Sequence, residues 1–166
     1  EAELIMAKLR ELGLEPEMDK AHEKTGGTCG NVWAYVKGTV PNAPKLLFEA
    51  HMDSVAPTTG TKVVRKDGVL YSDGTTTLGG DDKVGVAAML EAVRALKEDG
   101  VAHGDVQLCF TVSEEIGCLG VVSMDQSWIK ADYGYCMDIG GAPGEITYAA
   151  PKLYDIYVTV KGKAAH

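Results

Sequence analysis

The sequence predicts an α/β fold in which one sheet carries helices on both faces, a three-layer arrangement. Two observations support this class. Apolar, strand-like runs alternate with helical patterns in βαβ order along the chain, and one run, KLLFEA at residues 45–50, is apolar on both faces, as a central strand covered on both sides is. Histidine and carboxylate residues follow these runs directly, which is where open α/β sheets collect their functional groups.

The first half of the chain is expected to contain a helix, two strands and a hairpin. Residues 1–13 place apolar residues on one helical face, with Gly13 as a stop. NVWAYVKG at 31–38 alternates as a strand, and a proline-bearing stretch separates it from KLLFEA. KVVRKDGVLYSDG at 62–74 predicts a hairpin, because Asp67-Gly68 between two β-branched or aromatic runs favours a tight primed turn.

The second half predicts a long helix followed by further βαβ elements. Apolar residues recur at helical spacing from Asp82 to about Glu98, and Gly100 follows. DVQLCFTV at 105–112, a helix near 117–124 and the strand YGYCM at 133–137 come next. YDIYVTVKG at 154–162 alternates apolar and polar residues, as an antiparallel strand with one exposed face does. We therefore expect one main domain over residues 1–150 and the start of a second over 151–166.

Composition excludes several partners. A chain of 166 residues with 45% hydrophobic content can bury one sizeable core. Its net charge of −8 argues against nucleic acid and anionic membranes, since both require a basic surface. No apolar run is long enough to span a bilayer. The four cysteines show no CxxC spacing, which is typical of free thiols in a reducing compartment, so we expect a soluble, cytoplasmic protein.

The first two charged clusters follow a strand and precede the long helix. At the end of a strand, His51 can ligate a metal while Asp53 holds its other ring nitrogen; the alternative for this pair alone is a surface turn with a solvated histidine. Asp81 and Asp82 stand in LGGDDKVG at the start of the helix. One of these carboxylates can bridge two cations, and the other is expected to cap the helix.

Two further strand ends repeat the pattern. Glu114 and Glu115 follow the strand at 105–112 and, pointing in different directions, can divide the roles of general base and metal ligand. Asp138 follows the strand at 133–137. Alone, a glutamate pair can open a helix and an aspartate can close a turn. Together, these carboxylates indicate a two-metal hydrolase, and imidazole plus carboxylates without thiolate fit zinc, cobalt or manganese.

The segments HMDSV, LGGDDKVG and SEEIG and the later Met137-Asp138 resemble, as an ordered set, the zinc metallopeptidase family of tripeptidase T, carboxypeptidase G, aminoacylase and succinyl-diaminopimelate desuccinylase. The resemblance covers essentially the whole chain, and DGTTTLGGDDKVGVAAMLEA is most similar to the peptidase T branch. It implies a zinc exopeptidase-like catalytic domain over residues 1–150. Residues 151–166 would begin an α+β lid or dimerisation domain.

The resemblance also implies a role for each motif residue. His51 and Asp138 would bind the first metal, Asp81 would bridge both metals and Glu115 would bind the second. Asp53 would orient His51, and Glu114 would be the general base that takes a proton from the attacking water. His166, in GKAAH, would bind the substrate, with a histidine at a frayed terminus as the alternative.

One ligand of the family pattern is missing. The family supplies a histidine to the second metal from a later segment, and we expect His22 and His103 to lie in solvated loops instead. The chain begins without methionine inside a helical pattern and stops after a strand-like run, so we expect a fragment that is incomplete at both ends. The isolated piece could then bind metal weakly and be inactive.

The function expected from the resemblance is hydrolysis of an amide bond in a small peptide, by a tripeptidase or aminopeptidase that works as a homodimer in its full-length form. An N-acyl amino acid amidohydrolase of the same family is the nearest alternative. A non-catalytic metal-binding or interaction module and a phosphate binder are alternatives from other classes; the phosphate binder is disfavoured because no lysine-serine/threonine loop signature is present. Lys83 favours this family over the glutamyl aminopeptidase-like family, which shares similar acidic pairs.

Overall fold

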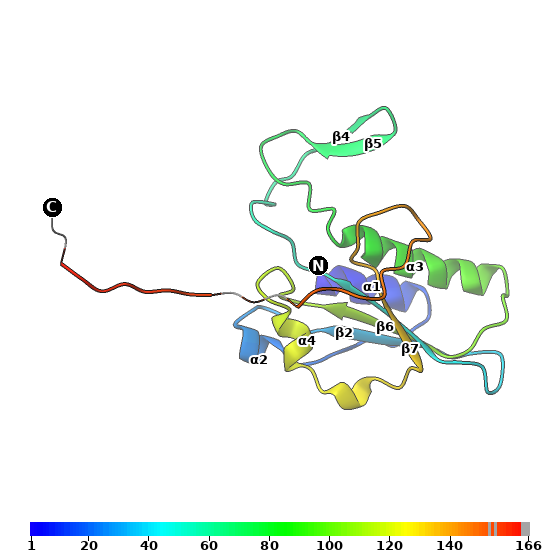
Figure 1. The fold of residues 1–166 in the computed structure, drawn as a ribbon. Coiled ribbons are helices and arrows are strands. Elements are labelled where there is room, and N and C mark those ends of the chain that lie inside the picture. Colours follow the sequence, from blue (N-terminus) through cyan, green and yellow to red (C-terminus); the bar gives the residue numbers. More distant parts are fainter. Residues whose placement is uncertain (153, 155, 164–166) are drawn as a thin grey trace.

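The computed structural model describes residues 1–152, 154 and 156–163, and it contains a five-stranded sheet, a separate two-stranded hairpin and helices on both faces of the sheet (Figure 1). The predicted fold class is confirmed. The elements in chain order are α1 (Ala2–Glu11), β1 (Glu17–Met18), α2 (His22–Thr25), β2 (Val32–Val36), β3 (Leu46–His51), β4 (Val63–Lys66), β5 (Val69–Ser72), α3 (Lys83–Glu98), β6 (Val106–Thr111), α4 (Leu119–Ser123), the 3-10 helix η1 (Gln126–Trp128) and β7 (Tyr133–Cys136).

The order of strands in the main sheet is β1-β2-β6-β3-β7. β3 pairs in parallel with β6 on one side, with Leu46 opposite Val106, and with β7 on the other, with Leu46 opposite Tyr133. β1 and β2 complete the sheet as antiparallel strands. Because β3, β6 and β7 run in the same direction, their carboxyl ends lie at one edge of the sheet.

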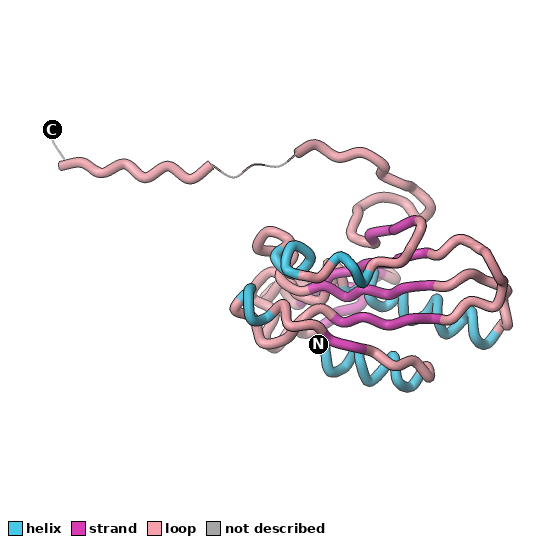
Figure 2. The backbone as a smooth tube through the Cα atoms, turned by 90° about the horizontal axis from the view of Figure 1, so that it is seen from below, coloured by secondary structure: helices cyan, strands magenta, loops and turns pink. Residues whose placement is uncertain are grey.

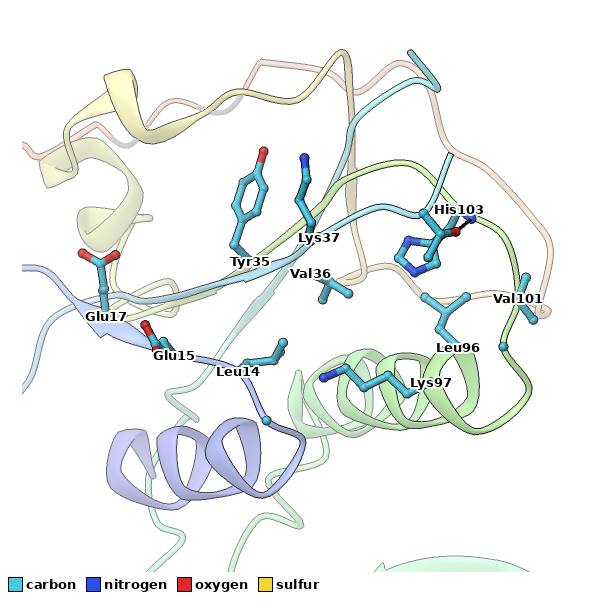
Figure 3. Close-up of a pocket in the computed structure, with 13 residues that line it drawn as sticks. Leu14, Glu15, Glu17, Tyr35, Val36, Lys37, Leu96, Lys97, Val101 and His103 are labelled. Carbon is cyan, nitrogen blue, oxygen red and sulfur yellow. Dashed lines mark hydrogen bonds between the residues drawn. The ribbon is translucent and has the colours of Figure 1, made fainter. Parts of the chain in front are cut away.

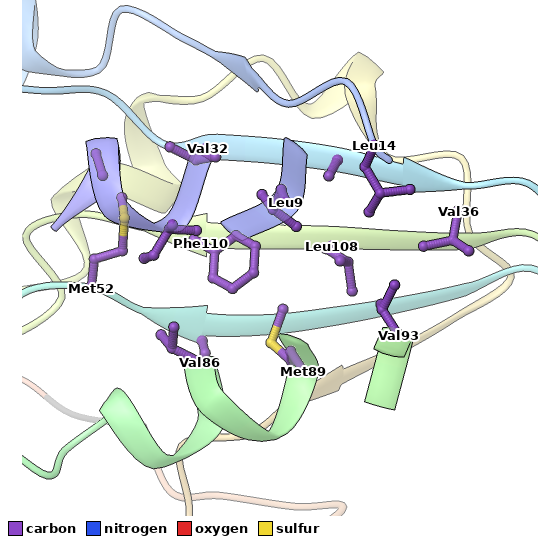
Figure 4. Close-up of a cluster of buried hydrophobic side chains, with 14 of the residues drawn as sticks. Leu9, Leu14, Val32, Val36, Met52, Val86, Met89, Val93, Leu108 and Phe110 are labelled. Atoms are coloured by element: carbon purple, nitrogen blue, oxygen red, sulfur yellow. The ribbon is translucent and has the colours of Figure 1, made fainter. Parts of the chain in front are cut away.

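The main hydrophobic core lies between the sheet and the helices α1 and α3, which cover the same face (Figures 1, 2 and 4). α3 contributes the stripe Val86, Met89 and Val93, which recurs at the spacing that the sequence predicts. Leu9 of α1 and Phe110 of β6 are fully buried in the same core. This packing holds α3, and the aspartates at its start, against the central strands.

The opposite face of the sheet is covered by α2, α4 and η1 (Figure 2). Trp33 of β2 packs edge-on against Trp128 of η1, with 5.5 Å between the ring centroids. The side-chain amide of Gln107 donates a hydrogen bond to the Trp128 carbonyl at 2.7 Å. The buried side-chain amide of Gln107 is therefore hydrogen-bonded on this face of the sheet.

Most predicted elements form where the sequence places them. The hairpin β4–β5 closes through Asp67 and Gly68 with φ of 51° and 81°, as a primed turn requires. β1, α2 and η1 were not predicted, because two to four residues are too few to show a period. Within the described residues, no helix has the length and apolar character needed to cross a membrane.

The strand predicted over residues 154–162 is wrong for the part of it that the structure describes. Residue 154 and residues 156–162 form no strand and are exposed. An alternating pattern becomes a strand only when a neighbouring strand supplies its hydrogen bonds, and no described residue pairs with this segment.

Candidate metal centre

The carboxyl edge of β3, β6 and β7 brings the predicted acidic residues together around one histidine. His51 is the last residue of β3, the middle strand of the three. Glu114 and Glu115 follow β6 on one side of it, and Asp138 follows β7 on the other. Asp81 arrives from the start of α3. Pairing between distant strands thus assembles residues that span almost ninety positions of the sequence.

The side chains are close enough to share a cation. His51 Nε2 lies 3.1 Å from Asp81 Oδ1, 3.9 Å from Glu114 Oε2 and 3.9 Å from Asp138 Oδ2. Two groups of residues, His51 with Glu114 and Glu115 and His51 with Asp81 and Asp138, each offer ligand atoms within 4.8 Å of one another. The imidazole is 1% exposed, and the donors are nitrogen and oxygen only, a set that suits zinc, cobalt or manganese.

Crowding of like charges is visible in the acid–base properties of the cluster. Burial, followed by the neighbouring Asp81 carboxylate, raises the pKa of Asp138 to about 6. Burial lowers the pKa of His51, but its hydrogen bond to Asp81 and the charges of Asp138, Asp53 and Glu114 outweigh burial and raise the pKa overall. Both groups therefore hold protons more tightly in the fold than in the unfolded chain.

We predict that the metal-free protein loses stability as pH rises from 3.8 through about 6 and further above 6.5. A group whose pKa is raised by folding stabilises the fold below its unfolded pKa, and this contribution is lost as pH rises through the folded pKa. For Asp138 the loss runs from its ordinary value of 3.8 to about 6, and for His51 it begins above 6.5. Thermal unfolding in a chelator should give a falling Tm, and added zinc should remove the fall.

Asp138→Asn is the informative variant for this prediction, because it removes one of the two groups and should flatten the pH dependence. Asp99→Asn, at an exposed position beyond α3, makes the same change in charge and should leave it unchanged. A Tm that rises across this pH range in the chelator would contradict the statement that folding raises the pKa of Asp138 and His51.

Asp53 joins the ends of β3 and β6. Its backbone carbonyl, and not its carboxylate, is the hydrogen-bond partner of His51 Nδ1, at 3.0 Å; the carboxylate oxygen lies 3.7 Å from that nitrogen. A carbonyl only accepts, so the ring donates from Nδ1 in this bond, while Nε2 faces the Asp81 carboxylate at 3.1 Å. The carboxylate instead accepts the backbone N–H groups of Glu114 and Glu115 at 3.1 and 3.2 Å.

Asp82 caps helix α3, as the sequence predicts. One carboxylate oxygen accepts the backbone N–H of Gly85 at 3.0 Å, and burial raises the pKa of this side chain. A Cβ on residue 85 would lie 2.3 Å from the Asp82 carboxylate, so glycine is required there. Asp81 is thereby left to point at His51.

Two residues that support the site were missed by the sequence reasoning. Asn31 is fully buried, donates to the Gly120 carbonyl at 3.0 Å and accepts the backbone N–H of Val112 at 3.1 Å, closing the loop that carries Glu114. Lys83 contacts the turn after β3. A single asparagine before a strand is common and had no specific signal, and from the sequence Lys83 served only to distinguish two families.

The other two histidines that the structure describes, His22 and His103, lie outside the cluster. His22 begins α2 and its Nδ1 is buried, so the expectation of a solvated loop is wrong there. His103 lies in a loop as expected but is only half-exposed, and its Nδ1 hydrogen-bonds the Gly104 carbonyl at 2.7 Å. His166, the predicted substrate-binding residue, lies outside the described residues.

A surface pocket lies at the opposite end of the strands and shares no residue with the metal centre (Figure 3). Its cavity volume is about 650 Å³, and it lies between the segment after α1, the end of β2 and the end of α3. Apolar side chains such as Leu14 and Leu96 line it together with Lys37 and Lys97. The candidate site is therefore defined by the acidic cluster and not by this pocket.

Comparisons with known proteins agree with this geometry. The sequence model described as "Peptidase family M20/M25/M40" matches residues 47–157. The Bacillus subtilis protein YqjE is 40% identical over 98% of this chain and 44% of its own length, and peptidase T of Geobacillus thermodenitrificans is 29% identical over 99% of this chain and 46% of its own. The chain thus spans less than half the length of these curated relatives.

Two solved structures are similar in both fold and sequence. The aminopeptidase PepT from Bacillus cereus superposes with a TM-score of 0.82 at 40% identity, over 84% of this chain and 38% of that one. A tripeptidase from Staphylococcus aureus gives a TM-score of 0.80 at 38% identity, over 84% and 37%.

Proposed function

Since this chain belongs to peptidase family M20/M25/M40, we propose that its acidic cluster is part of the active site of a metal-dependent enzyme that hydrolyses an amide bond in a small peptide. The observation that carries the proposal is the buried His51, with Nε2 facing carboxylates from three other segments within 4 Å. Such a cluster is costly without a cation, because like charges at this spacing repel.

The residues of the cluster fit two divalent ions, with zinc the first choice and cobalt or manganese as alternatives. We assign His51 and Asp138 to the first ion, Asp81 as the bridge and Glu115 to the second. The group of His51, Asp81 and Asp138 supports the first ion, and a second group, which shares His51, adds Glu114 and Glu115. Ions held there would polarise the scissile carbonyl and make a water molecule more acidic.

Glu114 is the proposed general base. One of its carboxylate oxygens faces His51 Nε2, and the other accepts the Cys118 thiol at 3.5 Å. The side chain is about one-third exposed, so it can reach both the cluster and an arriving substrate. It would take the proton of the attacking water and return it to the leaving amine. Asp53 holds the backbone of this residue and so sets where the carboxylate points.

The proposed substrate is a tripeptide or similar short peptide. Support comes from the names of relatives that are 29–40% identical to the chain over the aligned residues: peptidase T, an aminopeptidase and a tripeptidase. We further propose that residues 1–150 are part of the catalytic domain, that 151–166 begin a lid or dimerisation domain, and that the protein works as a homodimer in the cytoplasm. The four free cysteines support a reducing compartment.

Removal of metal tests the proposal directly. We expect the whole protein to hydrolyse a tripeptide, to lose this activity in a chelator and to regain it with added zinc, because the ions supply the polarisation that the side chains lack. Peptide cleavage followed by chromatography measures this, with an N-acetyl amino acid as the comparison substrate. Full activity in the chelator would refute metal dependence, and preferred cleavage of the N-acetyl compound would identify a deacylase instead.

A further inference from the structure

Asn31 closes the loop over residues 113–119, which carries both glutamates of the acidic cluster. Its side chain is fully buried just before β2. The side-chain oxygen accepts the backbone N–H of Val112 at 3.1 Å, and the amide nitrogen donates to the Gly120 carbonyl at 3.0 Å. The Gly120 N–H also donates to the Val112 carbonyl at 3.0 Å. The two ends of the loop are therefore joined to each other and to one buried side chain.

The neck of this loop is tightly packed. A Cβ on residue 120 would lie 2.1 Å from the Val112 carbonyl oxygen and 2.6 Å from Asn31 Oδ1, so only glycine fits there. Within the loop, the Asp53 carboxylate accepts the backbone N–H groups of both glutamates at 3.1 and 3.2 Å. The glutamate pair is thus held at two places, by Asp53 at the pair itself and by Asn31 at the neck.

Asp19 determines which way round the Asn31 amide lies. Its Oδ2 accepts the Asn31 side-chain nitrogen at 2.7 Å, and its Oδ1 accepts the backbone N–H groups of Asn31 at 2.7 Å and Ala21 at 2.9 Å. A carboxylate only accepts, so the amide nitrogen faces Asp19 and the amide oxygen is turned to Val112. Every polar atom of the buried amide is then hydrogen-bonded within the fold.

We propose that Asn31, oriented by Asp19, is a positioning residue that sets where Glu114 and Glu115 lie, and that it thereby controls turnover and zinc affinity. It acts through the backbone at the neck of the loop. The effect on turnover and zinc affinity rests on the proposed function, in which Glu114 is the base and Glu115 a metal ligand. The placement of the loop is a property of the metal-free protein.

Gln107 provides a matched control. It is also a buried side-chain amide that closes a loop, since it donates to the Trp128 carbonyl at 2.7 Å and accepts the Lys130 N–H at 2.6 Å. It lies near the start of β6, whereas the glutamates follow the end of that strand. Asn31→Leu and Gln107→Met each replace a buried amide by an apolar side chain of similar size. A difference between them therefore reports on the position of the amide and not on its loss.

Amide hydrogen exchange of the whole, metal-free protein, followed by NMR, tests the placement of the loop without any turnover. Asn31→Leu should speed the exchange of the Glu114 and Glu115 amides by about 10-fold or more, because a loop released at its neck opens more often. Gln107→Met should leave these two amides at their wild-type rates. Equal changes in both variants would mean that the loop responds to any loss of stability, and would overturn the inference.

Kinetics of the whole, zinc-loaded protein test the consequence. Asn31→Leu should lower kcat for tripeptide hydrolysis by about 10–100-fold with little change in KM, and should weaken zinc binding by a similar factor, the usual effect of removing a group that positions a ligand. Gln107→Met should keep wild-type kcat and zinc affinity. A merely structural role for Asn31 would lower stability in both variants and leave kcat unchanged.

Asp19→Asn keeps the inference testable if Asn31→Leu does not fold. The new side-chain oxygen can still accept the two backbone N–H groups, but its NH₂ group faces the NH₂ group of Asn31, so we expect amide exchange and kcat between those of wild type and Asn31→Leu. Wild-type exchange or wild-type kcat in these variants would overturn the inference. Absence of peptide hydrolysis in zinc-loaded wild type would instead overturn the proposed function and leave the exchange result standing.

Discussion

Replacement of Glu114 by glutamine is expected to lower kcat for tripeptide hydrolysis by about 10²–10⁴-fold, the range that a positioned general base contributes. The amide has nearly the shape of the carboxylate and keeps one oxygen, so packing near His51 and Cys118 should survive. It cannot take a proton from water, so the loss should fall on kcat more than on KM. Steady-state kinetics of the whole, zinc-loaded protein measure both.

Two other glutamates make the Glu114 test specific. Glu115→Gln should weaken zinc binding, because that residue is assigned to a metal, whereas Glu114→Gln should bind zinc nearly as wild type does. Glu3→Gln, exposed on α1, should change neither property. If Glu114→Gln retained wild-type activity, the general-base role would be refuted, and if it lost zinc as Glu115→Gln does, Glu114 would be a ligand.

Phe110→Ala is expected to lower the free energy of unfolding by about 3–5 kcal/mol, the usual result of truncating a buried phenylalanine. Phe110 is fully buried in β6, whose six residues are all buried, and it lies in the core that β6 and β3 share with α1 and α3 (Figure 4). A domain of this size is typically stable by about 5–15 kcal/mol, so much of its stability should disappear. Denaturant unfolding followed by circular dichroism measures the change.

Tyr148→Ala is the control for the core variant. That side chain is 95% exposed, so its removal should change the free energy of unfolding by less than about 0.5 kcal/mol. A similarly small loss for Phe110→Ala would mean that the core between the sheet and the two helices collapses around the missing ring, contrary to the close packing of its neighbours.

Prediction from sequence succeeded where the signal is local and repeated. The stripe of α3, the Asp67-Gly68 turn and the cap at Asp82 each depend on residues within a few positions of one another, and each forms as expected. It failed where a partner was needed, since the alternating residues 156–162 find no neighbouring strand among the described residues. It also missed β1, α2 and η1, which are too short to show a period.

The sequence by itself determined which residues could carry the proposed chemistry, because charged side chains interrupt its apolar runs at strand ends and at the start of the long helix. His51, Asp81, Glu114, Glu115 and Asp138 could all be named in this way. Only the tertiary structure decided that β3 lies between β6 and β7, which places His51 at the centre of the cluster. Strand order depends on pairing between distant segments, and no local pattern encodes it.

The tertiary structure also decided how the histidine is held. From the sequence, the spacing of His51 and Asp53 suggested a carboxylate on the ring, whereas the folded chain turns the Asp53 carbonyl to His51 and its carboxylate to the amides after β6. It brought Lys83 to the same carbonyl. Such choices between neighbouring acceptors depend on differences of less than an ångström, which only the packed backbone sets.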